Sequence, residues 1–255
     1  MQRVAALYDI HGNLPALEAV LDEVATAGVD AIVVGGDVLP GPMPKECLDR
    51  LYSTGLPTHF IHGNGESAAL QVLTGRVPEK VPEAVRPAVQ WSTEQLPDEY
   101  RQAIARWPSI LRVDIDGLGE VFFCHATARN DTELVTRLSP DGRVFEVFPE
   151  LKNTIVVCGH THMQFDRTVG SLRVINAGSV GMPFGEPGAH WLLLGPDVQL
   201  KRTSYDLDSA AARLRASAFP DVSAFVERQV LNRPTEEQIL AAYARADGRD
   251  AHRAP

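Results

Sequence analysis

Cysteine is scarce in this sequence. Among its 255 residues there are three cysteines, Cys47, Cys124 and Cys158, and no two of them are close together in the chain. Domains that depend on a disulfide framework carry more cysteines, at closer spacing. We therefore expect three free, buried thiols and a reducing compartment.

Long apolar runs are also lacking. No stretch approaches the roughly 20 apolar residues needed to cross a bilayer. The chain enters an apolar segment at residue 4, without a basic region ahead of it. The sequence thus predicts neither a membrane span nor a signal peptide, and we expect a cytoplasmic protein.

Positive charge is in short supply. The chain has 24 Lys and Arg residues against 33 Asp and Glu residues, a net charge of −9. This balance argues against binding long nucleic acids or a membrane surface through a basic face. A small anionic substrate is still compatible with it, because bound cations can reverse the local field.

The chain does contain a regular alternation of apolar and helical segments at its start. Apolar segments at 4–8, 31–34 and 58–62 are separated by helical spacing over 14–28 and 45–52. This order predicts parallel strands joined by right-handed crossovers. Ligands of such sheets bind beyond the carboxyl ends of the strands.

The remainder of the chain predicts more strands and two further helical regions. Residues 67–107 have helical spacing interrupted by prolines, and they either pack on the domain or form a cap over the site. Parallel pairing early and antiparallel pairing late predict an α/β fold with two sheets or one mixed sheet. The later predicted strands are 110–115, 120–124, 154–158, 165–169, 172–175, 190–194 and 198–203. We expect one domain over 1–205, with 67–108 as a helical insertion, and a C-terminal helical appendage over 206–255 whose last residues, 247–255, fray.

Polar side chains follow the predicted strands. Asp9 and His11 come directly after the first strand, and the two-residue period of a strand would point them the same way. Gly12 permits a sharp turn there. With the residues that follow the later strands, the set comprises four imidazoles, two carboxylates and one amide: Asp9, His11, Asp37, Asn64, His125, His160 and His162.

This donor set suits divalent transition metals. Mixed nitrogen and oxygen ligands bind manganese, iron, zinc, nickel or cobalt, and we expect manganese first. Seven ligands exceed one tetrahedral zinc site and match two ions that share a carboxylate. Such a pair acidifies a bound water and neutralises charge on a phosphoryl group. The residues therefore predict a two-metal phosphoesterase.

Several of these residues have structural alternatives. Asp37 could be a helix N-cap and Asn64 a turn residue. Asn13 is expected to cap the first helix, with substrate contact as a second role. Arg129 could clamp a phosphate oxygen or be a solvated loop charge. Glu66 could cap the following helix or support a metal ligand, and the sequence does not decide between these.

Five short motifs resemble, in order, the blocks of the calcineurin-like metallophosphoesterases. They are Asp9-x-His11, Gly35-Gly36-Asp37, Gly63-Asn64, His125 at a strand end, and Gly159-His160-x-His162. The similarity continues to about residue 203 and is closest to the small bacterial and archaeal phosphodiesterases. It implies a four-layer fold, in which two mixed sheets are flanked by helices.

The resemblance also implies roles for the residues. Asp9, His11 and His162 would hold one ion, and Asn64, His125 and His160 the other. Asp37 would bridge the two ions, and a hydroxide between them would attack a small phosphoester, nucleotide esters included. Asp37, His125 and Asn64 would be the catalytic side chains.

One position departs from the family pattern. Many members have a histidine after the asparagine of the third block, where it protonates the leaving group, whereas this chain has Gly65. His62 or a metal-bound water is the alternative proton donor, and the departure favours a diesterase over a monoesterase. Alternatives within the superfamily are a protein or dinucleoside polyphosphate phosphatase and a non-catalytic scaffold. The complete ligand set disfavours the scaffold.

Overall fold

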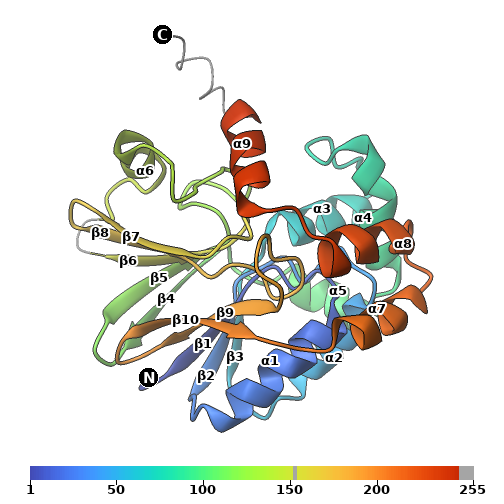
Figure 1. Ribbon diagram of the computed structural model, residues 1–255, viewed down its shortest axis with the longest axis horizontal. Coiled ribbons are helices and arrows are strands. Elements are labelled where there is room, and N and C mark those ends of the chain that lie inside the picture. The colour runs from blue at the N-terminus through green and yellow to red at the C-terminus, as the bar shows by residue number, and fades with distance from the viewer. Residues whose placement is uncertain (152–153, 247–255) are drawn as a thin grey trace.

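Two five-stranded sheets face each other, and helices cover both outer faces (Figure 1). The computed structural model describes residues 1–151 and 154–246. Four layers result, as expected, and both sheets are mixed. None of the helices in these two ranges is long and apolar enough to cross a membrane.

The first sheet has the order β10-β9-β1-β2-β3. Its parallel strands come from the start of the chain, and an antiparallel hairpin from much later in the sequence extends it beside β1. The bounds are β1 Val4–Leu7, β2 Ala31–Val34, β3 Thr58–Phe60, β9 Ala189–Leu194 and β10 Val198–Thr203.

The second sheet has the order β4-β5-β6-β8-β7. Its middle strands β5, β6 and β8 are parallel, and its two edge strands are antiparallel to their neighbours. The bounds are β4 Ile110–Ile115, β5 Gly119–Cys124, β6 Ile155–Cys158, β7 Phe165–Val169 and β8 Leu172–Asn176.

Alternate side chains of β1 are buried in two separate hydrophobic clusters. Val4 and Ala6 lie in the cluster between the sheets, against residues such as Phe123 of β5. Ala5 and Leu7 lie in the cluster formed with α1 (Leu14–Thr26) and α2 (Pro44–Tyr52). Because both faces are buried, this strand reads as an unbroken apolar run. On the far side, α6 (Asp141–Val147) covers the second sheet.

The predicted insertion is mostly helical. Its start lies within α3 (Asn64–Leu73), which begins three residues earlier than the predicted bound. It contains the 3₁₀ turn η1 (Glu83–Val85), α4 (Arg86–Glu94) and α5 (Asp98–Ile104). After β10 follow α7 (Leu207–Arg215), α8 (Val222–Val226), the π-helical turn η2 (Glu227–Leu231) and α9 (Glu236–Ala246). The predicted fraying of 247–255 concerns residues outside the described ranges.

The two helical regions meet beside the sandwich. In Figure 1, α7 and α8 lie on the same side of the sandwich as α4, and α9 points away from the sandwich. Trp91 in α4 and Phe219, just before α8, meet edge to face with ring centroids 5.5 Å apart. The division of the chain into one domain and an appendage stays a prediction.

Candidate metal centre

The predicted ligands gather where strands of both sheets end. Asp9 and Asp37 follow β1 and β2, whereas His125 and His160 follow β5 and β6. The backbone N–H of His160 donates to Asp9 Oδ2 at 2.8 Å, which ties the two sheets together at this edge.

The backbone here is unusual. Seven residues other than glycine have positive φ angles in the described chain, and five of them belong to the predicted ligand set: Asp9, His11, Asp37, His160 and His162, with φ between 48° and 65°. Left-handed backbone costs a non-glycine residue about 1–2 kcal/mol, so a cluster of it marks a functional site.

This backbone corrects one sequence argument. The first strand ends at Leu7, not at residue 8, so Asp9 and His11 converge through left-handed loop geometry and not through strand alternation. The third strand likewise ends at Phe60, before residue 62. The sharp turn at Gly12 is confirmed, because its φ is 58° and a Cβ there would lie 2.6 Å from the backbone of Gly41.

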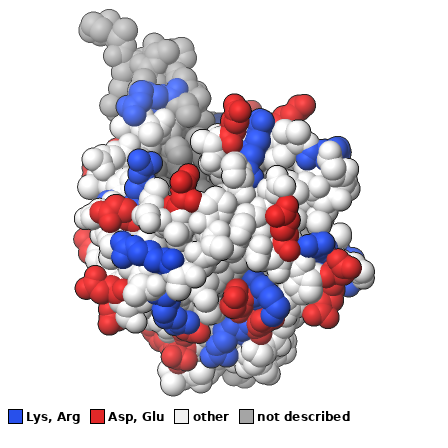
Figure 2. Space-filling view, turned by 90° about the vertical axis from the view of Figure 1, so that its right-hand side faces the viewer, with Lys and Arg blue, Asp and Glu red and all other residues white. Residues whose placement is uncertain are grey.

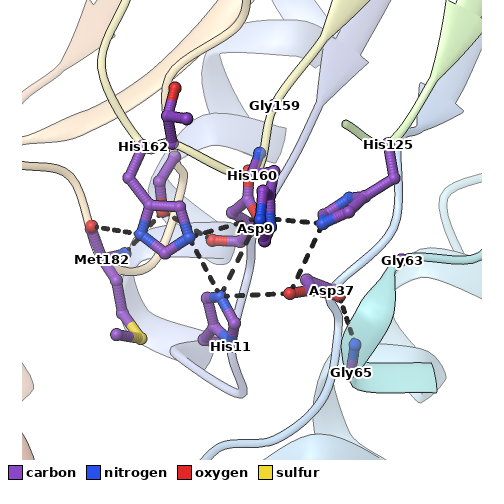
Figure 3. A network of polar contacts seen from close by, with 12 residues as sticks. Asp9, His11, Asp37, Gly63, Gly65, His125, Gly159, His160, His162 and Met182 are labelled. Carbon is purple, nitrogen blue, oxygen red and sulfur yellow. Dashed lines mark hydrogen bonds and ion pairs between the residues drawn. The ribbon is translucent and has the colours of Figure 1, made fainter. Parts of the chain in front are cut away.

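Six of the side chains form two groups, each with its potential ligand atoms within 4.8 Å of one another. Asp37 Oδ2 lies between the groups, 3.7 Å from His11 Nε2 and 3.6 Å from His125 Nε2 (Figure 3). The groups are Asp9, His11 and His162, and Asp37, His125 and His160.

A backbone carbonyl contacts each of the four imidazoles. Since a carbonyl oxygen only accepts, a neutral ring places its proton on the contacting nitrogen and leaves the other nitrogen with a free lone pair. Such contacts fix the orientation of metal-binding histidines. They join His11 Nδ1 to Pro40 O at 3.2 Å, His125 Nδ1 to Gly35 O at 2.9 Å, His162 Nδ1 to Met182 O at 2.9 Å and His160 Nε2 to Thr132 O at 3.3 Å.

The free atoms face one another in a way that suits cations. His11 Nε2 and His162 Nε2 are 3.3 Å apart. Asp9 Oδ1 is buried without a hydrogen-bond partner and lies 3.2 Å from His162 Nε2. The converging lone pairs of Asp9, His11 and His162 need a proton or a metal ion between them. The Asn64 side-chain amide lies 3.0 Å from His125 Nε2, and it can turn either its oxygen or its nitrogen toward the ring.

Burial and charge set the protonation of these groups. Burial lowers the pKa of His11 and of His160 to about 3, so both rings are neutral. Burial raises the pKa of Asp37 to about 8. Burial alone would lower the pKa of His125, but the carboxylates of Asp37 and Asp9 outweigh it and raise that pKa to about 9. Protons held by Asp37 and His125 would have to leave when a cation binds.

Glu66 has both of the roles left open by the sequence. It is fully buried, and its carboxylate accepts from the backbone N–H of Gly63 at 2.8 Å at the start of α3. The same carboxylate accepts from Asp37 N at 2.8 Å and from Leu39 N at 3.1 Å. Glu66 therefore fixes the loop that carries Asp37 against the helix that carries Asn64.

Packing explains the glycine at position 65. A Cβ on Gly65 would lie 2.0 Å from the carbonyl oxygen of Leu39 and 3.0 Å from Asp37 Oδ1. The Gly65 N–H donates to that same Asp37 oxygen at 2.7 Å. This backbone arrangement has no room for a side chain, so a histidine at position 65 is sterically excluded.

The two predicted substrate contacts lie in different surroundings. Asn13 is fully buried and caps α1 by accepting from Ala16 N, as expected, while its Nδ2 donates to Gly181 O. Arg129 is at the surface and pairs with Glu133 and Glu146. A phosphate clamp would have to displace these carboxylates, so both substrate roles stay predictions.

Comparison with known proteins identifies the family. Residues 2–197 match the model of the calcineurin-like phosphoesterase superfamily domain. The phosphodiesterase YfcE of Escherichia coli is 26% identical over 210 residues, which cover 78% of this chain and 90% of that protein.

Two solved structures share the fold. A metallophosphoesterase from Sphaerobacter thermophilus has a TM-score of 0.67 and 27% identity, and the match covers 91% of this chain and 99% of that one. Hypothetical protein PH1004 from Pyrococcus horikoshii has a TM-score of 0.77 and 18% identity, over 92% of this chain and 100% of that one. The second likeness concerns the fold alone.

Proposed function

The chain belongs to the calcineurin-like phosphoesterase superfamily and is a phosphoric ester hydrolase, and we propose that it uses two divalent cations to hydrolyse small phosphodiesters. The observation that carries the two-metal proposal is the pair of three-residue groups with Asp37 Oδ2 between them. The unpartnered Asp9 oxygen supports it.

Each group would hold one cation, with Asp37 shared between them. Asn64 would complete the group of His125 and His160, since its side-chain amide lies 3.0 Å from His125 Nε2 and can present its oxygen to a cation. Bound cations would supply an acidified water as nucleophile and a positive field for the phosphoryl oxygens, and manganese is our first choice of metal.

The residues of the chain would hold the centre in place. The four carbonyl contacts orient the rings, and Glu66 fixes Asp37. With position 65 closed to any side chain, no general acid stands there, which favours esters whose alcohol leaves easily. His62 lines a cavity of about 260 Å³ with His125 and Arg129 and is a candidate proton donor.

The surface and the thiols support a small substrate in a reducing, cytoplasmic setting. Figure 2 shows basic and acidic side chains interspersed over the viewed face, with uncharged surface between them. Long nucleic acids are bound through continuous basic surfaces. All three cysteines are buried and free.

Metal content and turnover test the proposal together. Purified protein should bind two manganese ions per chain and hydrolyse bis-p-nitrophenyl phosphate faster than p-nitrophenyl phosphate. Asp37→Asn should lower kcat at least about 100-fold, the scale of losing electrostatic stabilisation in a site. Asp98→Asn is the matched control, because Asp98 is an exposed carboxylate that pairs with Arg101 at the surface. Two bound metals without turnover of any ester would favour the scaffold instead.

A further inference from the structure

A cavity of about 340 Å³ opens next to the candidate metal centre. His11 and Asn64 are among the residues that line it, so it adjoins the proposed reaction site. Two segments supply most of the remaining wall, residues 84–88 of η1 and α4 and residues 219–229 around α8 and η2. The second segment lies beyond residue 197, where the family match ends.

The wall of this cavity is aromatic and firmly held. Phe219 and Phe225 meet edge to face, with ring centroids 5.5 Å apart at 76°. The edge contact between Phe219 and Trp91 of α4 joins the segment to the insertion. Val85, on the other wall, is 41% exposed although it is apolar. An apolar wall beside charged ligands suits a flat, uncharged part of a substrate.

Polar groups lie along the same wall. Gln229 and Arg228 both line the cavity. Arg228 is exposed, and none of the ion pairs within the two described ranges involves it. An amide and a guanidinium can bind the edge of a ring that carries its own donors and acceptors. A plain phenyl group would leave them unused.

We propose that residues 84–88 and 219–229 form a subsite for a planar heterocycle with a hydrogen-bonding edge, such as the base of a nucleoside phosphoester. The phosphoryl group lies at the metal ligands, the ring lies against Phe225, and Gln229 and Arg228 bind its edge. This inference rests on the proposed phosphoesterase function and specifies its substrate class.

Binding measurements separate the ring from the phosphate. Adenosine 5′-phosphate and ribose 5-phosphate share phosphate and sugar and differ in the base. Calorimetry on the manganese-loaded protein should give the adenosine ligand about 5- to 10-fold tighter binding, the range expected for an aromatic contact. Phenyl phosphate has a ring without polar edges. Its affinity should exceed that of methyl phosphate by a smaller factor than the affinity of adenosine 5′-phosphate exceeds that of ribose 5-phosphate.

Variants then locate the contact. Phe225→Leu keeps an apolar side chain but removes the flat ring, and it should bring the two sugar phosphates to within about 2-fold of each other. Gln229→Ala should weaken the adenosine ligand and leave phenyl phosphate unchanged. Phe145→Ala is the matched control, because Phe145 is an exposed phenylalanine on α6, outside the residues that line this cavity. The affinity of these variants for ribose 5-phosphate and their metal content should both stay unchanged.

The outcomes distinguish the two proposals. Equal affinity of the unmodified protein for both sugar phosphates would overturn the subsite and leave the phosphoesterase standing. Retention of the full preference for adenosine in Phe225→Leu would also overturn it. Failure of every phosphate ligand to bind the manganese-loaded protein would instead count against the proposed function itself.

Discussion

Replacing Glu66 should damage both the fold and the centre. Its carboxylate accepts three backbone N–H donors, from Asp37, Leu39 and Gly63, and these come from two separate loops. Because the side chain is fully buried, water does not already compete for these donors. Glu66→Ala would leave all three without their acceptor.

The magnitude follows from these contacts. Hydrogen bonds to a charged acceptor contribute about 1.5–3 kcal/mol each, so three at the low end total about 4.5 kcal/mol. Water entering the vacated space would restore part of this stabilisation. We therefore expect Glu66→Ala to lower the free energy of unfolding by about 3–4 kcal/mol. Glu66→Gln keeps one acceptor oxygen but loses the charge and a bond, and should cost about 2 kcal/mol.

Urea unfolding of the metal-free protein, followed by circular dichroism, gives the free energies. Glu18→Ala is the matched control, because Glu18 pairs with Arg213 at the surface and should cost less than about 1 kcal/mol. Manganese affinity should also fall about 10-fold in Glu66→Gln, the usual effect of losing a group that supports a metal ligand. A Glu66→Ala protein as stable as the Glu18→Ala protein would refute the reasoning.

Three further predictions concern other parts of the chain. Manganese at 100 times the Kd of each site should stabilise the protein by about 2.7 kcal/mol per site, or about 10–20 °C in Tm for two sites, and Asp37→Asn should at least halve this shift in a thermal melt. Gly65→His should lower the free energy of unfolding by at least about 2 kcal/mol without raising turnover, because its Cβ would lie 2.0 Å from the Leu39 carbonyl; a stable, faster enzyme would contradict this. Burial, with Arg202 nearby, lowers the pKa of His190 to about 4, so its contribution to stability is complete above about pH 6.5 and is lost as pH falls toward 4. The loss due to His190 should reach about 3 kcal/mol in urea melts, and His190→Asn should remove this part of the pH dependence while the part due to the buried His11 and His160 remains.

The strands and the ligand set could be predicted because local patterns determine them. Burial on both faces makes β1 a continuous apolar run, and the residues after parallel strands share one edge of a sheet. Such signals do not specify long-range pairing. The sequence left open two sheets or one, because nothing near residues 189–203 indicates that this hairpin pairs with β1 at the other end of the chain.

The details of the centre depend on contacts that no motif encodes. Glu66 reaches Asp37 across 29 residues of sequence, and the clash that keeps position 65 a glycine comes from Leu39. The aromatic wall around Phe225 lies beyond the family match, so the motif blocks gave no indication of it. Each of these features follows from tertiary packing between segments that are separate in the sequence.

The strained backbone indicates that the fold, and not the metal, shapes the centre. Five left-handed residues at about 1–2 kcal/mol each amount to a considerable cost, which surrounding contacts must offset before any cation binds. Those contacts are present, since Glu66 holds the loop of Asp37 and backbone carbonyls hold the four rings. A centre held this firmly should stay folded when it is stripped of metal and bind cations again without rearrangement. That expectation separates this protein from small metal-dependent domains, which are unfolded without their ions.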